Sequence, residues 1–359
     1  MNRSDRSDRS DRSDRSDRSD RSSRSDRSLA TIVLVCAFVV ACGGSRPSNE
    51  IRIPRGAGGV GFLPLLLMEK HRLIEKHAAE AGIPDLTVRW VDLGGPSVVN
   101  DALLSGAADY AAAGPPAMLT LWDRTRDQIG VAGVAAMTSL PMYLNTNAPH
   151  LKTVDDLRDT DKIAVTAIKV SIPALVMQMY AAKKYGAADA ARFDKYTVSM
   201  THPDAVVALL SGATGISAHF ASPPFHQRER RDPKIRTIMT SDEVMGGSTT
   251  FTMLSTTRKF REENPQVYKA VLRALEEANA RIAADPREAA TILLASTPGS
   301  GFSVDETIAM LTDPAVKFTT TPENVGKYAT FMHDIGSIRQ RPASWKDVFF
   351  PEIHAAPGS

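Results

Sequence analysis

The chain has 359 residues, of which 43% are apolar and 23% are charged, so it has enough material for one large globular domain or two smaller ones. Its 43 basic and 41 acidic residues give a net charge of +2. Nine Arg and seven Asp lie in residues 1–28, so the remainder holds 34 basic and 34 acidic residues. Because a nucleic-acid-binding surface needs an excess of basic side chains, this balance argues against nucleic acid as a partner.

Residues 1–28 form an Arg-Ser-Asp repeat without an apolar side chain after Met1, which predicts a disordered, low-complexity segment. The next thirteen residues, 29–41, are uncharged and mostly apolar. They are too few to span a bilayer, which needs about 20, but they match the hydrophobic region of a signal peptide. A buried strand that happens to contain a cysteine is the alternative.

The two cysteines of the chain, Cys36 and Cys42, both lie at this hydrophobic stretch. Residues 39–42, "VVAC", resemble the lipobox of bacterial lipoprotein signals, in which the cysteine becomes the lipidated first residue of the mature chain. The resemblance implies that Cys36 is removed with the signal, that Cys42 carries lipid, and that residues 42–50 form a tether. Without a free thiol in the mature chain, chemistry by a cysteine would be excluded.

From residue 51 onward, short apolar runs alternate with longer periodic stretches, which indicates an α/β fold. The pattern predicts, in chain order, a strand at 51–54, one helix over 62–82, a strand at 86–93, a helix at 97–105, a strand at 108–114 and a helix at 115–124. Each of the three strands is followed by glycine, and open α/β sheets bind ligands in the loops that follow their strands.

The loop after the first strand, Gly56 to Gly61, has the spacing G-x-G-x-x-G. A dinucleotide site also needs an acidic residue about 20 positions further on, whereas Asp92 lies 31 positions after Gly61. Two interpretations remain open: a glycine-rich turn without a ligand, and a loop whose backbone N–H groups approach an anion at a helix N-terminus.

An internal repeat points to two similar halves. "ALLSGAADYAAAGPP" begins at Ala102, and "ALLSGATGISAHFASPP" begins at Ala208 with two extra residues. Chance in an alanine-rich chain is one explanation. The other is that a helix, a strand and a ligand-side loop occur once in each of two lobes that face each other across a cleft.

The second half continues the α/β pattern. It predicts a helix capped by Thr153 and Asp156, a strand at 162–167, a helix from Ser171 to Gly186, strands at 194–199 and 234–240 on either side of a helix at 203–212, and a β-rich run at 248–256 that returns to the first lobe. Further helices are predicted to begin at Asn264, Asp285, Ser303 and Thr321.

The order of these pieces resembles the substrate-binding proteins of ABC importers, in the branch for nitrate, taurine, aliphatic sulfonates and thiamine precursors. The resemblance is carried by residues 61–77, 92–119, 151–165 and 258–295, and it spans roughly residues 50 to 350. It implies a two-lobe periplasmic-binding-protein fold of type II, with residues 51–145 in lobe 1, 146–252 in lobe 2 and 253–359 returning to lobe 1. The crossings are expected near Leu144 to Asn147 and near Thr250 to Leu254.

The same resemblance implies an exported, lipid-anchored monomer that needs no cofactor and delivers a small ligand to a membrane permease. The loops expected at the cleft supply these candidate ligand-binding residues: Gly58, Gly59, Val60, Gly61, Phe62, Gly94, Gly95, Gly114, Pro115 and Ser139 from lobe 1, and Lys169, Ser171, His219, Phe220, Thr249 and Thr250 from lobe 2. Arg55 and Lys169 are the nearest cations. The family's acidic residue after the "SG" pair is kept as Asp109 but replaced by Gly215 in the second copy.

Other chemistries find little support in the sequence. The eight histidines show no H-E-x-x-H pattern or close pair, so no metal site is expected, and neither G-x-S-x-G nor a phosphate-binding G-x-x-x-x-G-K occurs. Enzymes that resemble this family use cysteine, which the mature chain would lack. A sulfonate, taurine, nitrate, a carboxylate and an aminopyrimidine remain open as ligands. A thiamine-pyrimidine-precursor binder and a non-cysteine enzyme are the alternatives to anion capture.

Overall fold

Two main β-sheets define two lobes in the computed structural model, which describes residues 49–212 and 215–359. The sheet of lobe 2 has the order β7-β6-β8-β5-β9. Its strands are β5 (Tyr143–Thr146), β6 (Ile163–Val165), β7 (Thr197–Ser199), β8 (Ala218–Ala221) and β9 (Arg236–Thr240). Strand β6 runs parallel to β7 and β8, whereas β5 lies antiparallel between β8 and β9.

Lobe 1 repeats this arrangement. Its strands are β1 (Glu50–Pro54), β2 (Thr87–Val91), β3 (Tyr110–Ala113), β4 (Val131–Ser139), β10 (Thr250–Thr257) and β11 (Lys317–Phe318). Strands β1 and β2 pair in parallel, and the other four have the order β11-β4-β10-β3 with β10 antiparallel to β3 and β4. A hydrogen bond of 2.9 Å from the Asp109 amide to the Arg52 carbonyl joins β1 to the start of β3.

The two lobes therefore share one topology. In each, a strand from a distant part of the chain lies antiparallel between two others: β10 lies between β3 and β4 in lobe 1, and β5 lies between β8 and β9 in lobe 2. The internal repeat predicted from the sequence is confirmed, because β3 and β8 occupy the same position in the two sheets. The equivalent backbone bond in lobe 2 runs from the Ser217 amide to the Lys162 carbonyl, also at 2.9 Å. Ser217, rather than Gly215, is thus the counterpart of Asp109, because the second copy has two extra residues before its strand.

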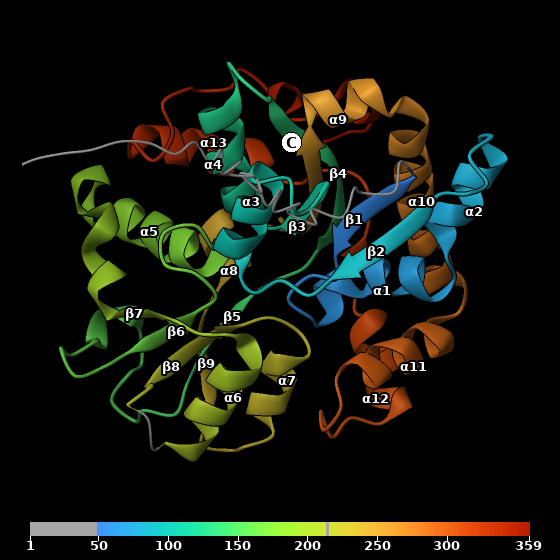
Figure 1. Cartoon of the computed structure of the whole chain (residues 1–359). Helices are drawn as coiled ribbons and strands as arrows, with labels where there is room; N and C mark the ends of the chain where they lie inside the picture. The colour runs from blue at the N-terminus through green and yellow to red at the C-terminus, as the bar shows by residue number, and fades with distance from the viewer. Residues whose placement is uncertain (1–48, 213–214) are drawn as a thin grey trace, which may run out of the picture. The chain divides into compact units, whose positions relative to one another are not determined.

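Helices cover both sheets, and most begin where proline or a capping side chain predicts. They are α1 (Leu63–Lys70), α2 (Leu73–Glu80), α3 (Pro96–Leu104), α4 (Pro115–Thr125), α5 (Ile172–Tyr185), α6 (His202–Ser211), α7 (Phe225–Arg230), α8 (Ser241–Met245), α9 (Arg258–Glu263), α10 (Pro265–Ala284), α11 (Pro286–Ser296), α12 (Val304–Leu311) and α13 (Val325–Asp334). In Figure 1, α6 and α7 lie beside the strands of lobe 2, whereas α1, α2 and α10 lie together beside β1 and β2.

Three predicted helices differ from the structure. The helix expected over 62–82 is two helices, because Arg72 adopts the left-handed conformation with φ 50° between α1 and α2. The capping box of Thr153 and Asp156 is present, but it begins only a single 3-10 turn, Val154–Asp156, since Leu157 is extended. No helix starts at Thr321; α13 begins at Val325 after the left-handed residue Asn324.

The chain changes sheets earlier than predicted. Strand β4 ends at Ser139 in lobe 1 and β5 begins at Tyr143 in lobe 2, so the first crossing is the segment 140–142 rather than Leu144 to Asn147. The second crossing is the segment 246–249, because Thr250 to Leu254 already pair within β10. Sequence patterns gave no separate signal for β4 and β5, which a short turn containing Pro141 divides.

The hydrophobic core is largest in lobe 1, where α1, α2 and α10 pack together. Leu65, Leu67 and Ile74 have no exposed surface there. Complete burial of such a side chain contributes about 1.5–3 kcal/mol, so this face of lobe 1 is a rigid base for the loops above it.

The predictions for the Arg-Ser-Asp repeat, the signal region and the lipidated Cys42 fall on residues 1–48, outside the described residues.

Candidate functional site

A cavity lies where the carboxyl ends of the strands of both lobes meet. Its wider part has a volume of about 440 Å³, and a narrow extension of about 50 Å³ reaches further between the lobes. Ala57 and Gly94 from lobe 1 and Thr166 and His202 from lobe 2 line both parts. The loops that supply them follow β1, β2, β6 and β7, the position at which open α/β sheets bind ligands.

Helix N-termini from both lobes point their first residues at this cavity. Pro96 of α3, Gly114 before α4, Ile172 of α5 and His202 of α6 all line it. Within the described residues, the backbone N–H groups of Ser97, Ile172 and His202 have no hydrogen-bond acceptor. The helix dipole places partial positive charge at such ends, so the unpaired groups can donate to an anion.

Glycines allow the lobes to come into contact across the cleft. A Cβ atom on Gly114 would lie 2.8 Å from the Ile172 side chain, and one on Gly95 would lie 3.0 Å from the carbonyl oxygen of Thr166. Gly59 has φ 84°, and its Cβ would lie 3.0 Å from the carbonyl oxygen of Pro223. That same oxygen accepts a hydrogen bond of 3.2 Å from the Val60 amide.

One titratable side chain, His202, lines the cavity among the described residues. Its Nδ1 lies 2.8 Å from Nε2 of His219, and Nδ1 of His219 lies 2.5 Å from Oε1 of Glu229. Oε2 of Glu229 accepts a hydrogen bond of 2.7 Å from Nδ2 of Asn145. Burial, and secondarily the neighbouring His219, lower the pKa of His202 well below its ordinary value, so its imidazole is neutral at physiological pH.

Neither of the two cations expected near the ligand faces the cavity. Arg55 donates to both carboxylate oxygens of Glu69 and to Asp92, with the three bonds between 2.7 and 2.8 Å. The hydrogen bond with Glu69 is the largest cause of the raised pKa of its guanidinium, so Arg55 is committed to this pair of acids. Lys169 lies at a different cavity, with residues 187–194 and 334–337.

The other predicted site residues divide into those that line the cavity and those that do not. Phe62, Gly94, Gly95, Gly114 and Ser171 line it. The predicted residues that do not line it are Gly58, Gly59, Val60, Gly61, Pro115 and His219. Ser139, Phe220 and Thr250 are buried within strands, and Thr249 is buried in the crossing segment 246–249. Thr250 pairs with Ser139 across β10 and β4, and its hydroxyl accepts a hydrogen bond from the Glu323 amide, so both are structural.

His202, Thr201 and Thr166 were missed by the sequence predictions. Thr201 caps α6 and is followed by His202 and Pro203, the same order of cap, bulky residue and proline as Ser171, Ile172 and Pro173 at α5. That shared pattern could have identified His202, because both helices begin at the cleft edge of the sheet of lobe 2.

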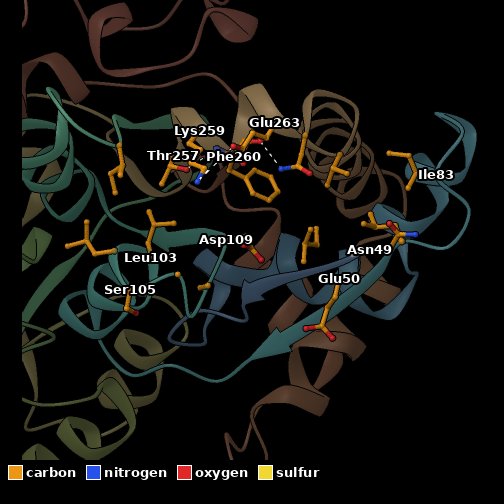
Figure 2. Close-up of a pocket in the computed structure, with 18 residues that line it drawn as sticks. Asn49, Glu50, Ile83, Leu103, Ser105, Asp109, Thr257, Lys259, Phe260 and Glu263 are labelled. Carbon is orange, nitrogen blue, oxygen red and sulfur yellow. Dashed lines mark hydrogen bonds and ion pairs between the residues drawn. The ribbon is translucent and has the colours of Figure 1, made fainter. Parts of the chain in front are cut away.

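A larger cavity of about 650 Å³ lies elsewhere, on lobe 1 alone (Figure 2). It is lined by the start of β1 at Glu50, by Asp109 before β3 and by Phe260 of α9. These residues lie at the amino ends of β1 and β3, away from the loops that the two lobes share. Although it is the larger hollow, it does not lie where an α/β sheet binds its ligand, and we regard the cavity between the lobes as the candidate site.

The described part of the chain has neither a metal-binding cluster nor a membrane-spanning helix. Residues 49–212 and 215–359 contain no cluster of three His, Cys, Asp or Glu side chains that could hold a metal ion. Over the same residues, no helix is both long and apolar enough to cross a bilayer.

Two α/β lobes with a cavity at their shared edge define the class of proteins that have the periplasmic-binding-protein fold, and solved structures share that fold. The alkanesulfonate-binding protein SsuA from Xanthomonas axonopodis pv. citri, bound to MOPS, has a TM-score of 0.64 at 18% identity over 85% of this chain and 99% of its own. The aliphatic sulphonate binding protein SsuA from Escherichia coli has a TM-score of 0.57 at 16% identity, covering 85% of this chain and 92% of its own. The nitrate-binding protein NrtA from Synechocystis PCC 6803 has a TM-score of 0.59 at 15% identity, covering 83% of both chains.

Within that class, the chain belongs to the NMT1/THI5-like family, whose model, described as "NMT1/THI5 like", matches residues 79–289. No curated protein matches the sequence. The family match and the shared fold confirm the resemblance that the sequence showed to substrate-binding proteins of ABC importers, and they confirm the two-lobe α/β fold.

Proposed function

We propose that this protein captures a small organic anion between its lobes and delivers it to the permease of an ABC importer. The observation that carries the proposal is a set of backbone N–H groups without an acceptor among the described residues. Those of Ile172 and His202 in lobe 2 belong to residues that line the cavity, and that of Ser97 in lobe 1 follows the lining residue Pro96. Because an anion bound there would be held by helix N-termini of both lobes, its binding would favour the arrangement in which the lobes touch.

The walls of the cavity support an anion with a short apolar part. Phe62, Val99, Met142 and Phe251 line the narrow extension, and the hydroxyl-bearing residues Thr166 and Thr201 line the wider part. Ligand pockets of this size and mixed character hold small molecules. A short alkanesulfonate or taurine matches both parts, whereas nitrate would leave the apolar walls without a partner.

A neutral aminopyrimidine is the second candidate ligand. It is favoured by the lining itself, in which the two cavity parts contain no Lys, Arg, Asp or Glu among the described residues, and by the neutral imidazole of His202. An uncharged ring would pack against the same apolar walls, and its ring nitrogens would accept hydrogen bonds from the backbone N–H groups.

Export and anchoring complete the proposed function. Lipidation of Cys42 would hold an exported, monomeric binding protein at the membrane near its permease. In this proposal the chain captures a ligand and does not catalyse a reaction. Metabolic labelling with a fatty-acid analogue, compared between the natural chain and Cys42→Ala, tests the anchor separately from ligand binding.

A thermal-unfolding screen tests the proposed ligand. Ethanesulfonate, taurine, nitrate, succinate and hydroxymethylpyrimidine would each be added to the purified protein. A ligand at 100 times its dissociation constant adds about 2.7 kcal/mol of stability, which raises Tm by several degrees. A shift with ethanesulfonate or taurine supports the proposal, a shift with hydroxymethylpyrimidine alone supports the second candidate, and no shift with any of them contradicts both.

A proline substitution then places the ligand at the helix ends. Ser97→Pro removes one unpaired N–H at the second position of α3, and α4 shows that two prolines can begin a helix in this fold. Loss of a hydrogen bond to a charged group, about 1.5–3 kcal/mol, weakens binding roughly tenfold to hundredfold. Asp305→Pro, at the second position of α12 and outside both cavity parts, is the matched control and leaves affinity unchanged.

A further inference from the structure

Behind the cavity, three ionisable side chains form a hydrogen-bonded chain that runs into the interior of lobe 2. His202 lies at the cavity and is 5% exposed, whereas His219 and Glu229 are 1% and 0% exposed. They come from α6, β8 and α7, so three elements that are separate in the sequence hold them in line. We call this set the histidine chain.

The positions of the protons in the histidine chain follow from its chemistry. A carboxylate only accepts, so Nδ1 of His219 carries a proton and donates to Glu229. The contact of 2.8 Å between Nε2 of His219 and Nδ1 of His202 then holds a single proton, which belongs to one ring or the other. Because Nδ1 of His202 takes part in this contact, Nε2 is the ring nitrogen left to meet a ligand in the cavity that His202 lines, and the position of the shared proton fixes whether Nε2 donates or accepts.

With the shared proton on His202, both rings are neutral, the histidine chain has the charge −1 of Glu229, and Nε2 of His202 presents a lone pair. With one additional proton, His219 is an imidazolium that donates to both neighbours, and His202 carries its proton on Nε2. The histidine chain is then neutral and presents an N–H donor. The two states differ by one proton and have opposite preferences for a ligand.

We propose that the histidine chain takes up one proton when an anion binds in the cavity, which changes Nε2 of His202 from an acceptor into a donor aimed at the anion. This inference rests on the proposed function, since it concerns how the same site accepts negative charge. Because the described lining of both cavity parts has no Lys or Arg, a proton from solvent supplies the charge that such a side chain would otherwise provide.

The surroundings place the added proton on His219. Its neighbour Glu229 compensates the charge directly, whereas an imidazolium at His202 would be buried beside Phe225, whose ring stacks on it at 5.0 Å. Burial, followed by repulsion from His219, lowers the pKa of His202 and opposes a charge on that ring itself.

The other charged and titratable groups near the histidine chain do not take over this role. His226 lies 3.1 Å from Asn145 and stacks on Tyr143, and burial, followed by the nearby Arg230, lowers its pKa to about 4. It is therefore neutral over the physiological range. Asp204, two residues after His202, accepts a hydrogen bond from Thr201 at the exposed start of α6.

Calorimetry with ethanesulfonate measures the proton directly. Ethanesulfonate stays ionised between pH 5 and pH 9, so any proton taken up must enter the protein. Titrations at pH 8 in two buffers with different ionisation enthalpies are expected to give about one proton taken up per anion bound, and affinity is expected to fall as the pH rises, by up to about tenfold for each pH unit. Binding without proton uptake, and without a pH slope, overturns the inference.

Two variants separate the histidine chain from other sources of pH dependence. Glu229→Gln removes the negative charge and can still accept from Asn145 and donate to His219, so His202 keeps a proton on Nε2 and anion affinity no longer falls with rising pH. His202→Gln abolishes proton uptake and weakens binding while leaving the buried pair of His219 and Glu229 in place. A pH slope that persists in His202→Gln contradicts the inference even if Glu229→Gln does not fold.

Failure of the proposed function would give a different result. If none of ethanesulfonate, taurine and succinate binds at any pH from 5 to 8, the proposed function is wrong, and NMR of the ¹⁵N-labelled histidines in the ligand-free protein still decides the chemistry. The inference expects the proton of His202 to move from Nε2 to Nδ1 as the pH rises. An unchanged His202 tautomer from pH 5 to pH 9 overturns it.

Discussion

The two lobes have the same strand order but begin their cleft-facing helices in different ways. In lobe 1, α3 and α4 follow Gly95 and Gly114 and have no side-chain cap. In lobe 2, α5 and α6 follow Ser171 and Thr201, whose hydroxyls accept from the first turn. At Gly114 the facing group of lobe 2 is the Ile172 side chain, whereas at Gly95 it is the backbone carbonyl of Thr166, so lobe 1 contributes bare backbone to both contacts.

The interiors differ in the same sense. The inserted strand of lobe 1, β10, buries Thr252 and Thr256, whose hydroxyls donate to the carbonyl oxygens of Gly61 and Asp109 at 2.6 Å. The inserted strand of lobe 2, β5, buries Asn145, which donates to the carboxylate of Glu229. The inserted strand of lobe 1 therefore satisfies these two buried hydroxyls with backbone carbonyls, whereas that of lobe 2 binds a fully buried acid, Glu229, behind the ligand cavity.

The largest effect should come from removing that buried acid. Glu229→Ala leaves His219 and Asn145 without their partner, and loss of one member of a buried pair costs about 3–5 kcal/mol of unfolding free energy. Urea unfolding followed by circular dichroism measures the change. Thr256→Val, its counterpart in lobe 1, removes one neutral hydrogen bond and should cost only about 1 kcal/mol. Equal costs in the two lobes would contradict the contrast between their interiors.

An intermediate effect, on binding rather than on folding, is expected at the glycine contact. Gly114→Val places methyl groups against Ile172 and opposes contact between the lobes. Overpacking costs about 1–3 kcal/mol, so affinity for the ligand identified by the thermal screen should fall roughly tenfold to hundredfold.

The double variant Gly114→Val with Ile172→Ala provides the control for this steric argument. It restores space at the contact and should recover most of the affinity, which a double-mutant cycle by calorimetry measures. If affinity is not recovered, the loss comes from lobe 1 itself, where the carbonyl oxygen of Phe251 lies 3.2 Å from the added Cβ position.

The smallest effect should come from giving lobe 2 a cap of the lobe 1 kind. Thr201→Ala loses the hydroxyl that accepts from the Asp204 amide and should lower stability by about 1 kcal/mol, whereas Thr201→Gly should cost only a few tenths. The urea midpoints of the two variants test this order. A greater loss with glycine than with alanine would show that the hydroxyl cap is not what distinguishes the helices of lobe 2.

Local patterns predicted most of the fold because its elements carry their own signals. Ser171 with Pro173, and Ser303 with Glu306, begin α5 and α12 where the sequence indicated. The repeat around Ala102 and Ala208 revealed the two lobes because each copy is one continuous segment of helix, strand and loop. The break at Arg72 was missed because the residues around it favour a helix, and only the backbone conformation of that one residue divides α1 from α2.

The site was harder to predict because its parts come from distant segments. The loops after the strands contain the predicted residues Phe62, Gly94 and Gly114, which line the cavity. The alignment of His202 with His219 and Glu229 depends on α6, β8 and α7 packing together, which no spacing in the sequence reveals. For the same reason Arg55 was predicted to be one of the cations nearest the ligand, although it pairs with Glu69 on α1.

The prolines at the starts of the cleft helices carry a consequence for how selective the protein can be. Pro96, Pro115, Pro173 and Pro203 fix the backbone before any ligand arrives, so little conformational entropy is lost on capture. Each also removes a donor, so the N–H groups that remain are few and their directions are set. A few N–H donors in fixed positions distinguish ligands by the geometry of their oxygen atoms more than by their charge. The backbone cannot change its conformation to fit a ligand whose head group does not match.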